Sequence, residues 1–180
     1  MSYMVQIIEL FGRKANVAAL AFFMENPTAE IHASGLAKKT GLSRNSTSGA
    51  LSLLSRLGLA KPKKMGKAIF YSLNRGDPTV KALKRLLTIS RLRQALVKEG
   101  VEGAEVYLFG SAARGEDTKR SDIDVLVIGG EGKRRDRQLF AALGGERIKI
   151  AFFTPMEFSM LARKDKPFYD AIERDKVRLL

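Results

Sequence analysis

Apolar residues recur at helical spacing through the first part of the chain. Within residues 5–25 they return every three or four positions, with a break near Gly12, which predicts two short helices. Residues 29–32 predict a short strand, and residues 33–40 predict a short helix that Gly41 terminates. The chain is therefore expected to begin with short helices and one strand.

A longer helix is predicted from a Ser43 cap to about Leu57, ended by Gly58. Its inward side is expected to carry Thr47, Leu51 and Leu54, with Ala50 and Leu57 beside them. Small polar residues and Arg lie on the other side, near the helix start, and such residues suit a DNA major groove. The candidate DNA-binding residues here are Ser43, Arg44, Asn45, Ser46, Ser48 and Ser52, with Gly49 among them.

A hairpin is predicted after this helix, because residues 59–65 and 68–73 are two extended stretches on either side of Gly66. Its tip and arms carry Lys61, Lys63, Lys64 and Lys67, which we take as further DNA-binding candidates. Pro78 suits the first turn of another helix. The apolar spacing from residue 79 to about 99 predicts a basic helix that connects two domains. Its apolar side is also a candidate surface for a second subunit.

The motif Leu42-Ser43-x-x-Ser46-x-Ser48-x-x-Leu51-x-x-Leu54-x-x-x-Gly58-Leu59, followed by a basic hairpin, resembles the winged helix-turn-helix of prokaryotic transcriptional regulators. The hairpin would then be the wing. This resemblance implies double-stranded DNA as a partner. It also implies a homodimer, because such regulators generally read two half-sites.

The charge distribution supports a polyanion partner for the first half of the chain. The net charge is +13. Residues 1–76 carry 11 Lys and Arg against 3 acidic residues, and residues 77–98 carry 6 against 1. Residues 99–180 carry 15 of each sign, so the entire excess lies before residue 99. A generally charged surface would spread the excess evenly.

Residues 107–128 contain the most informative pattern in the chain. They predict a buried strand, a Gly110-Ser111 turn, a short helical or looped segment, and a second strand carrying Asp122 and Asp124. Because side chains alternate along a strand, the two carboxylates share one face, and Ile123 and Val125 share the other. Paired Asp oxygens suit Mg²⁺, and exposed N–H groups at a Gly-containing turn suit phosphate.

Gly110-Ser111, ten further residues and Asp122-x-Asp124, with Ala113-Arg114-Gly115 between them, resemble the minimal nucleotidyltransferases of the DNA polymerase β superfamily. The resemblance implies Mg²⁺ and an NTP as ligand or substrate. Asp122 and Asp124 would be the metal-binding and catalytic residues. The nucleotide-binding candidates are Gly110, Ser111, Arg114 and Ser121. Further along, the pattern predicts helices at 136–143, 155–163 and 167–174, and strands at 147–154 and 176–180.

The chain departs from that superfamily at one position. Members place a third carboxylate on the next strand, and the matching position by register is Lys149. A cation cannot bind Mg²⁺, and a protonated Lys is no general base. Glu146, through a one-residue shift or bulge, and Glu131 or Glu157, by folding back, are the alternative carboxylates.

These patterns predict an α+β chain with three parts. Residues 1–76 form a winged-helix DNA-binding domain, residues 77–99 form the connecting helix, and residues 100–180 form a nucleotidyltransferase-like mixed sheet with flanking helices. No apolar run approaches the roughly 20 residues that span a bilayer. The N-terminus shows no signal-peptide pattern and Cys is absent, so together with the lack of a spanning run a cytoplasmic location without membrane contact is expected.

Three functions are compatible with these patterns. The first, which we favour, is a DNA-binding transcriptional regulator whose C-terminal domain binds NTP and Mg²⁺, with catalysis impaired by Lys149. The second is an active nucleotidyltransferase that moves NMP to a protein or small-molecule hydroxyl. It would resemble antitoxins that modify HEPN-type toxins, and its winged helix would serve autoregulation. The third is a scaffold that uses both domains for protein contacts.

Overall fold

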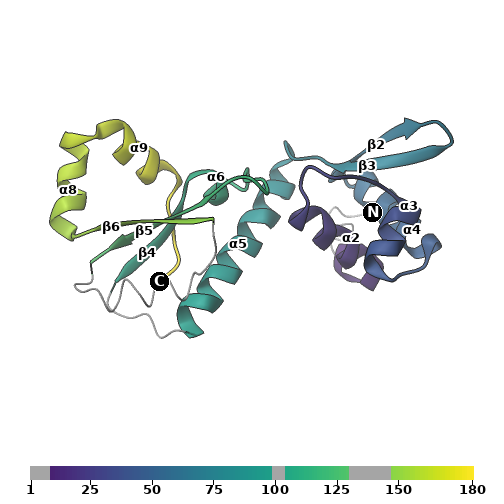
Figure 1. Cartoon of the computed structure of the whole chain (residues 1–180), viewed down its shortest axis with the longest axis horizontal. Helices are drawn as coiled ribbons and strands as arrows, with labels where there is room; N and C mark the ends of the chain where they lie inside the picture. Colours follow the sequence, from purple (N-terminus) through teal and green to yellow (C-terminus); the bar gives the residue numbers. More distant parts are fainter. Residues whose placement is uncertain (1–8, 99–103, 130–146) are drawn as a thin grey trace. The chain divides into compact units, whose positions relative to one another are not determined.

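The computed structural model describes residues 9–98, 104–129 and 147–180 (Figure 1). The fold is α+β, as the sequence predicts, with a helical segment and a small sheet followed by a mixed sheet with helices. The chain divides into two units, residues 1–80 and 81–180. The predicted helix at 136–143 and the alternative carboxylates Glu131 and Glu146 lie outside the described residues. No helix of the described part is long and apolar enough to cross a membrane.

The helices of the first unit match the predicted ranges closely. They are α2 (Lys14–Glu25), α3 (Ala33–Thr40) and α4 (Arg44–Arg56), with strand β1 (Glu30–His32) before α3. α2 begins after a bend at residues 12–13, close to the break predicted near Gly12. α4 begins where predicted because the Ser43 hydroxyl accepts a hydrogen bond from the Ser46 N–H at 3.1 Å.

Buried side chains of α2, α3 and α4 form the core of the first unit. The predicted inward residues Thr47, Ala50, Leu51 and Leu54 are buried, and Leu57 is half-buried. Leu53, which the pattern did not single out, is buried too. The Thr47 hydroxyl also lies 3.0 Å from the Ala33 carbonyl oxygen, so it joins the start of α3 to α4. That bond helps to set the geometry of the helix-turn-helix.

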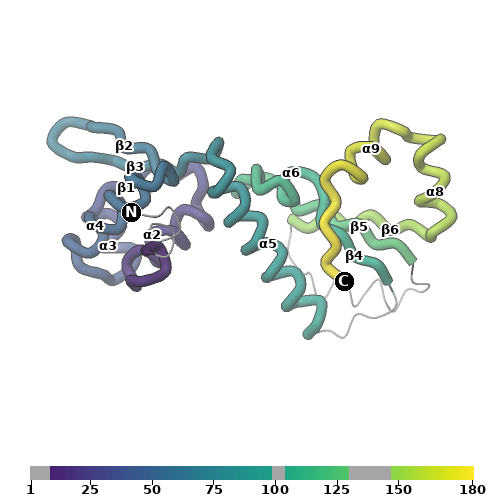
Figure 2. The backbone as a smooth tube through the Cα atoms, turned by 180° about the vertical axis from the view of Figure 1, so that it is seen from behind, coloured from purple at the N-terminus to yellow at the C-terminus, as the bar shows by residue number. Residues whose placement is uncertain are grey.

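Strands β2 (Ala60–Met65) and β3 (Ala68–Leu73) form the predicted hairpin. Together with β1 they make an antiparallel sheet in the order β1-β3-β2 (Figure 2). His32 holds the start of α3 in place. Its Nδ1 accepts from the Gly35 N–H at 3.1 Å, and its ring stacks on Phe70 with centroids 4.9 Å apart. The first unit is therefore a winged helix-turn-helix, with β2 and β3 as the wing.

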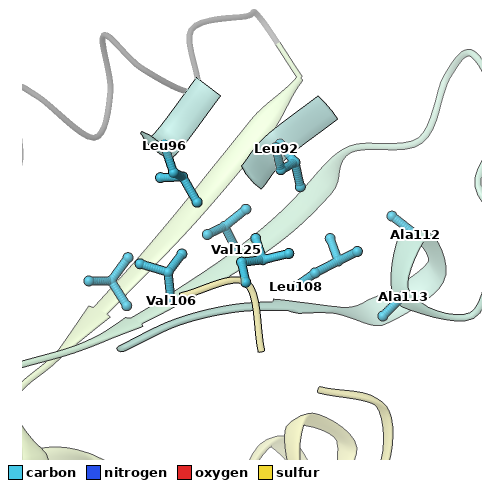
Figure 3. Packing of buried hydrophobic residues seen from close by; sticks show 9 residues of the cluster. Leu92, Leu96, Val106, Leu108, Ala112, Ala113 and Val125 are labelled. Carbon is cyan, nitrogen blue, oxygen red and sulfur yellow. The ribbon is translucent and has the colours of Figure 1, made fainter. Parts of the chain in front are cut away.

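Helix α5 (Pro78–Lys98) begins at the predicted proline, where the Asp77 carboxylate accepts from the Thr79 and Val80 N–H groups at 2.8 and 3.2 Å. The boundary between the two units falls within this helix. In the second unit, Leu92 and Leu96 of α5 pack against the sheet (Figure 3). The helix is thus part of the C-terminal core as well as a connection.

The second unit is built on a four-stranded mixed sheet in the order β6-β5-β4-β7. β5 and β6 are parallel, and the other neighbours are antiparallel. Its strands are β4 (Glu105–Phe109), β5 (Ile123–Ile128), β6 (Ile148–Phe153) and β7 (Val177–Arg178). Its helices after α5 are α6 (Gly110–Ala113), α8 (Pro155–Lys164) and α9 (Lys166–Asp175).

Alternation along the strands gives this sheet two different faces. Val106, Leu108 and Val125 belong to the cluster that contains Leu92 and Leu96 of α5. Phe109, Leu126 and Ile128 belong to a second cluster with Ile172 of α9 and Phe158 of α8. Helix α5 therefore covers one face, and α8 with α9 covers the other.

The strand and helix ends differ from the predicted ones by a few residues. β5 begins at Ile123, so Asp122 precedes the strand and only Asp124 lies within it. The closing strand is limited to residues 177–178, because Leu179 turns into the core and its N–H bonds the Val106 carbonyl at 2.7 Å.

Candidate functional site

The Gly110-Ser111 turn and Asp124 lie against each other, although they are far apart in the chain. Phe109, the last residue of β4, pairs with Asp124 of β5. Gly110 follows with φ 71°, a conformation that favours glycine. A Cβ on Gly110 would lie 2.6 Å from the Asp124 Oδ2 atom. Only glycine therefore allows this carboxylate to rest on the turn.

Asp122 and Asp124 lie at the start of β5, and Lys149 of β6 lies beside them. Lys149 is the register partner of Asp124, as the sequence predicts. Its Nζ atom is 2.6 Å from Asp122 Oδ2. Alternation places Asp124 and Lys149 on the same face of the sheet as Leu126 and Ala151, which is the face covered by α8 and α9.

The electrostatics of the two carboxylates differ. Burial raises the pKa of the Asp124 carboxyl; Lys149 lowers that pKa in part, and Asp122 raises it further. The hydrogen bond to Asp122 raises the pKa of the Lys149 ammonium, which therefore stays charged at neutral pH. Asp124 is thus a partly desolvated acid whose charged form would be stabilised by a further cation.

The donor set fits a single divalent cation. Mg²⁺ commonly takes one or two protein carboxylates and completes its shell with phosphate oxygens and water, and Asp122 and Asp124 supply such oxygens. Within the described ranges there is no group of three or more acidic or His side chains that could hold a metal. Glu157 does not join the pair, because its carboxylate accepts from the Thr154 N–H at 2.8 Å in a capping box on α8.

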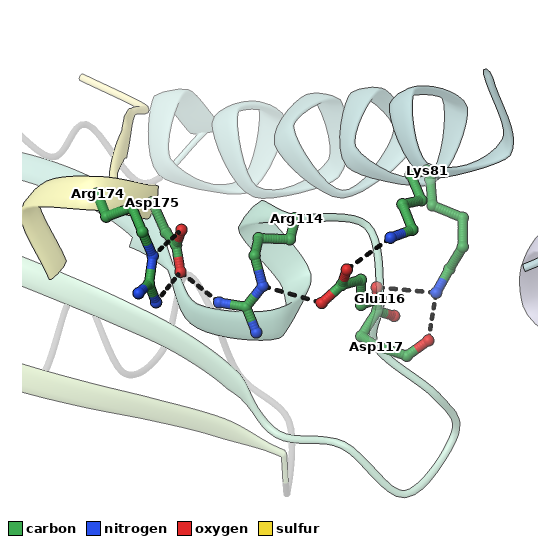
Figure 4. A network of polar contacts seen from close by, with 7 residues as sticks. Lys81, Arg114, Glu116, Asp117, Arg174 and Asp175 are labelled. Atoms are coloured by element: carbon green, nitrogen blue, oxygen red, sulfur yellow. Dashed lines mark hydrogen bonds and ion pairs between the residues drawn. The ribbon is translucent and has the colours of Figure 1, made fainter. Parts of the chain in front are cut away.

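The two remaining nucleotide-binding candidates have partners within the protein. Ser121 closes the turn before the Asp pair, where its hydroxyl accepts from the Thr118 N–H at 2.9 Å. Arg114 bonds Glu116 at 2.9 Å and also Asp175 at the end of α9 (Figure 4). Their nucleotide-binding role stays a prediction.

Arg114 belongs to a network of charged residues that the sequence did not reveal (Figure 4). Lys81 Nζ lies 2.7 Å from Glu116, and Lys84 Nζ lies 2.9 Å from the Asp117 carboxylate and also bonds the Asp117 carbonyl. Lys84 is only 5% exposed. The segment between the Gly-Ser turn and the Asp pair is thereby fixed to α5. One signal in the sequence could have indicated a buried charged contact: Lys84 lies on the same face of the helix as the apolar Leu92.

The candidate DNA-binding residues of the first unit are exposed on α4 and on the wing. None of the α4 candidates is buried, and the four wing lysines are exposed. Those on α4 and its cap are Ser43, Arg44, Asn45, Ser46, Ser48 and Ser52, and those on the wing are Lys61, Lys63, Lys64 and Lys67. The fold leaves each of them available to a partner.

The turn, the Asp pair and the mixed sheet agree with a comparison against protein families. Residues 89–177 match the family model of the nucleotidyltransferase domain. The matched residues include the second half of α5, the Gly-Ser turn, the Asp pair and Lys149.

A curated protein of Methanocaldococcus jannaschii, named "Putative protein adenylyltransferase MJ1379", is 40% identical to this chain over 48 residues. The match covers 27% of this chain and 48% of that protein, so the chain spans about half the length of the curated relative it matches.

Among solved structures, HlyU from Vibrio cholerae N16961 has a TM-score of 0.38 and 26% identity, over 47% of this chain and 83% of HlyU. NolR from Sinorhizobium fredii has a TM-score of 0.38 and 24% identity, over 48% of this chain and 82% of NolR. The winged-helix assignment rests on the geometry of residues 30–73.

Proposed function

We propose that this chain is a DNA-binding transcriptional regulator whose nucleotidyltransferase domain binds an NTP together with Mg²⁺. The observation that supports the nucleotide half is the close approach of Gly110 and Asp124, because the turn proposed to bind phosphate lies against the carboxylate proposed to bind the metal. The match of residues 89–177 to the nucleotidyltransferase family supports the same assignment.

Each site residue has a distinct role in this proposal. Gly110 gives the triphosphate close access to backbone N–H groups, and Ser111 offers a hydroxyl. Asp122 and Asp124 would hold Mg²⁺, which neutralises phosphate charge when bound. Lys149 keeps Asp122 oriented through their 2.6 Å contact.

Nucleotide binding is tested by calorimetric titration of the full chain with each of the four NTPs in the presence of Mg²⁺. Asp124→Asn should weaken binding about tenfold or more, because a lost charge-assisted interaction costs about 1.5–3 kcal/mol. Asp170→Asn, which neutralises an exposed carboxylate on α9, is the matched control and should leave affinity unchanged. Failure of all four NTPs to bind the wild-type chain would refute the nucleotide half.

The DNA half rests on the exposed polar start of α4 together with the basic wing. Backbone phosphates are neutralised by Lys and Arg, which supply most non-specific DNA affinity, and base edges are read by side chains of a helix in the major groove. This unit, residues 1–80, carries 11 Lys and Arg against 4 acidic residues, a net charge of +7. We further propose that the regulator acts as a homodimer on two half-sites.

DNA binding is tested by gel shift and by fluorescence anisotropy at several salt concentrations, with a duplex from upstream of the gene and a mixed-sequence duplex. Arg44→Ala should weaken specific binding by about 1–3 kcal/mol. Lys63→Ala/Lys64→Ala should weaken both duplexes and reduce the salt slope by about 2. Arg163→Ala, which removes an exposed charge from the second unit, is the control. Unchanged affinity in both Arg44→Ala and Lys63→Ala/Lys64→Ala would contradict this half.

A second candidate function is nucleotidyl transfer to a protein hydroxyl, for instance on a toxin-like partner. The similarity to a protein named as an adenylyltransferase favours it. The acceptor oxygen would form a bond to the α-phosphorus, the bond from that phosphorus to the bridging oxygen would break, and pyrophosphate would leave with the electron pair. The hydroxyl proton would pass to water, because Lys149 stands where a carboxylate base would otherwise lie.

Transfer is tested with α-labelled NTPs, the full chain and candidate acceptor proteins. If the second function holds, label should appear on an acceptor and disappear with Asp122→Asn/Asp124→Asn. Label on no acceptor with any of the four NTPs would leave the nucleotide-binding regulator as the better account.

A further inference from the structure

Lys149 occupies a position in the site where it can meet a bound polyphosphate. It lies on β6, in register with Asp124 of the parallel strand β5, and on the same face of the sheet. Its side chain is 72% exposed, although its Nζ is fixed 2.6 Å from Asp122 Oδ2. The strand pairing fixes the backbone, and Asp122 fixes the direction of the side chain.

The Lys149 ammonium retains hydrogen-bonding capacity. An ammonium has three N–H donors. The contact with Asp122 Oδ2 uses one of them, and the exposure of the side chain leaves the others accessible to a ligand. A triphosphate held by a cation on Asp122 and Asp124 would therefore find a fixed positive charge next to it.

Formal charges support a specific role for this residue. Two carboxylates, one ammonium and one divalent cation give the site a net charge of +1. Three carboxylates with two divalent cations give the same net charge. Replacing a carboxylate by Lys therefore allows one metal ion to be omitted without changing the charge that the triphosphate meets.

We propose that Lys149 takes the place of a second divalent cation, so that the site binds one cation per nucleotide and the Lys149 ammonium binds the triphosphate directly. This inference rests on the proposed nucleotide binding. It makes Lys149 a ligand-binding residue and assigns the site a one-cation stoichiometry.

The stoichiometry is measured by native mass spectrometry of the full chain with Mn²⁺ and α,β-methylene-ATP, which cannot be cleaved at that bond. The wild-type chain should carry one nucleotide and one Mn²⁺. Lys149→Asp should carry one nucleotide and two Mn²⁺, because a third carboxylate then faces the pair. Lys98→Asp, the same charge change on an exposed residue of α5, which covers the opposite face of the sheet, should stay at one Mn²⁺.

Nucleotide affinity gives a second readout. Lys149→Met should weaken binding of α,β-methylene-ATP with Mn²⁺ about tenfold or more, and Lys149→Arg should retain most of the affinity. Because the side chain is exposed, these variants are expected to fold, which circular dichroism can verify.

The outcomes separate this inference from the proposed function. Two Mn²⁺ ions on the nucleotide-bound wild-type chain would overturn the inference and leave nucleotide binding intact. One Mn²⁺ in Lys149→Asp, together with unchanged affinity in Lys149→Met, would overturn it as well. A wild-type chain that binds no nucleotide, including the four NTPs, would overturn both.

Discussion

At Gly115 the backbone approaches helix α5 more closely than a residue with a side chain would allow. Its φ is 69°, and a Cβ on it would lie 2.1 Å from the Lys81 carbonyl oxygen of α5. Because that atom belongs to a helix backbone, it cannot rotate away. The position requires glycine for both its conformation and its contact.

Gly115→Ala should destabilise the chain by about 2–5 kcal/mol, through left-handed backbone strain and overpacking together. Gly41→Ala is a matched control, because Gly41 has φ 70° and a Cβ there would meet nothing within 4 Å, so it reports backbone strain alone. Chemical denaturation measures both. Equal losses of unfolding free energy in the two variants would show that the close approach to Lys81 does not contribute to the effect of Gly115→Ala.

Thr47 is a second residue whose substitution has a defined expected effect. It is fully buried, and its hydroxyl lies within 3.2 Å of the Ala33, Ser43 and Arg44 carbonyls. Thr47→Val keeps the shape but removes the hydroxyl, so a loss of about 1–2 kcal/mol is expected from denaturation curves. Ser48→Ala, exposed on the next position of α4, should change stability by less than about 0.5 kcal/mol.

At the scale of elements, α5 fixes the segment that joins the Gly-Ser turn to the Asp pair. Lys81 and Lys84, one turn apart, bind Glu116 and Asp117. At its other end the network continues through Arg114 to Asp175 of α9. Both helical layers of the second unit are thus linked to the turn that would hold phosphate.

Lys84→Met should cost about 1–3 kcal/mol, because it leaves the Asp117 carboxylate without its buried partner. It should also weaken nucleotide binding, since the segment between turn and Asp pair is released from α5. Asp117→Asn in the same chain should restore part of the stability. Lys98→Met, an exposed lysine at the end of α5, is the control, and an equal effect there would exclude a specific role for Lys84.

Glu116 should give the domain an acid-sensitive contribution to stability. Hydrogen bonds from Lys81 and Arg114 lower the pKa of Glu116 from 4.5 to about 2. Because the folded pKa is below the unfolded one, this contribution is present above pH 4.5 and is lost as the pH falls toward 2. Melting temperatures should therefore fall less steeply in this range for Glu116→Gln than for the wild type. Parallel curves would contradict this.

Local signals in the sequence account for most of these elements. The range of α3 and the Ser43 cap of α4 are predictable, because caps and apolar spacing are local. The position of Lys149 beside the Asp pair is predictable, because it matches the third carboxylate of the superfamily that the motif resembles, and the structure pairs it with Asp124. The network around Glu116 is not, because it joins α5, a turn and α9 through side-chain contacts that no spacing records. The roles of the nucleotide- and DNA-binding candidates stay predictions.

At the scale of the whole molecule, the chain combines two units of similar net charge, +7 for residues 1–80 and +6 for residues 81–180, with different proposed ligands. A ligand stabilises only the unit that binds it, by about 2.7 kcal/mol at 100 times its Kd. Calorimetry of the full chain should therefore show two unfolding transitions. NTP with Mg²⁺ should raise the midpoint temperature of one of them by on the order of 10 °C.

The other transition is identified with Leu51→Ala, which removes a fully buried side chain of the winged helix and should cost about 2–5 kcal/mol. That variant should lower the midpoint temperature of the transition that nucleotide does not shift. A single transition, raised by nucleotide and lowered by Leu51→Ala, would show that the two units unfold together.

Because Gly110 and Asp124 lie so close together, a single substitution at position 110 can test the site in living cells. A single methyl at position 110 would displace the Asp124 carboxylate from the turn while every charge of the chain is retained. If the proposed nucleotide binding holds, a strain carrying Gly110→Ala would lose it but keep a winged helix of native charge. Comparing transcription from a promoter that the chain binds, in that strain and in the wild type, would test whether the proposed regulation depends on nucleotide.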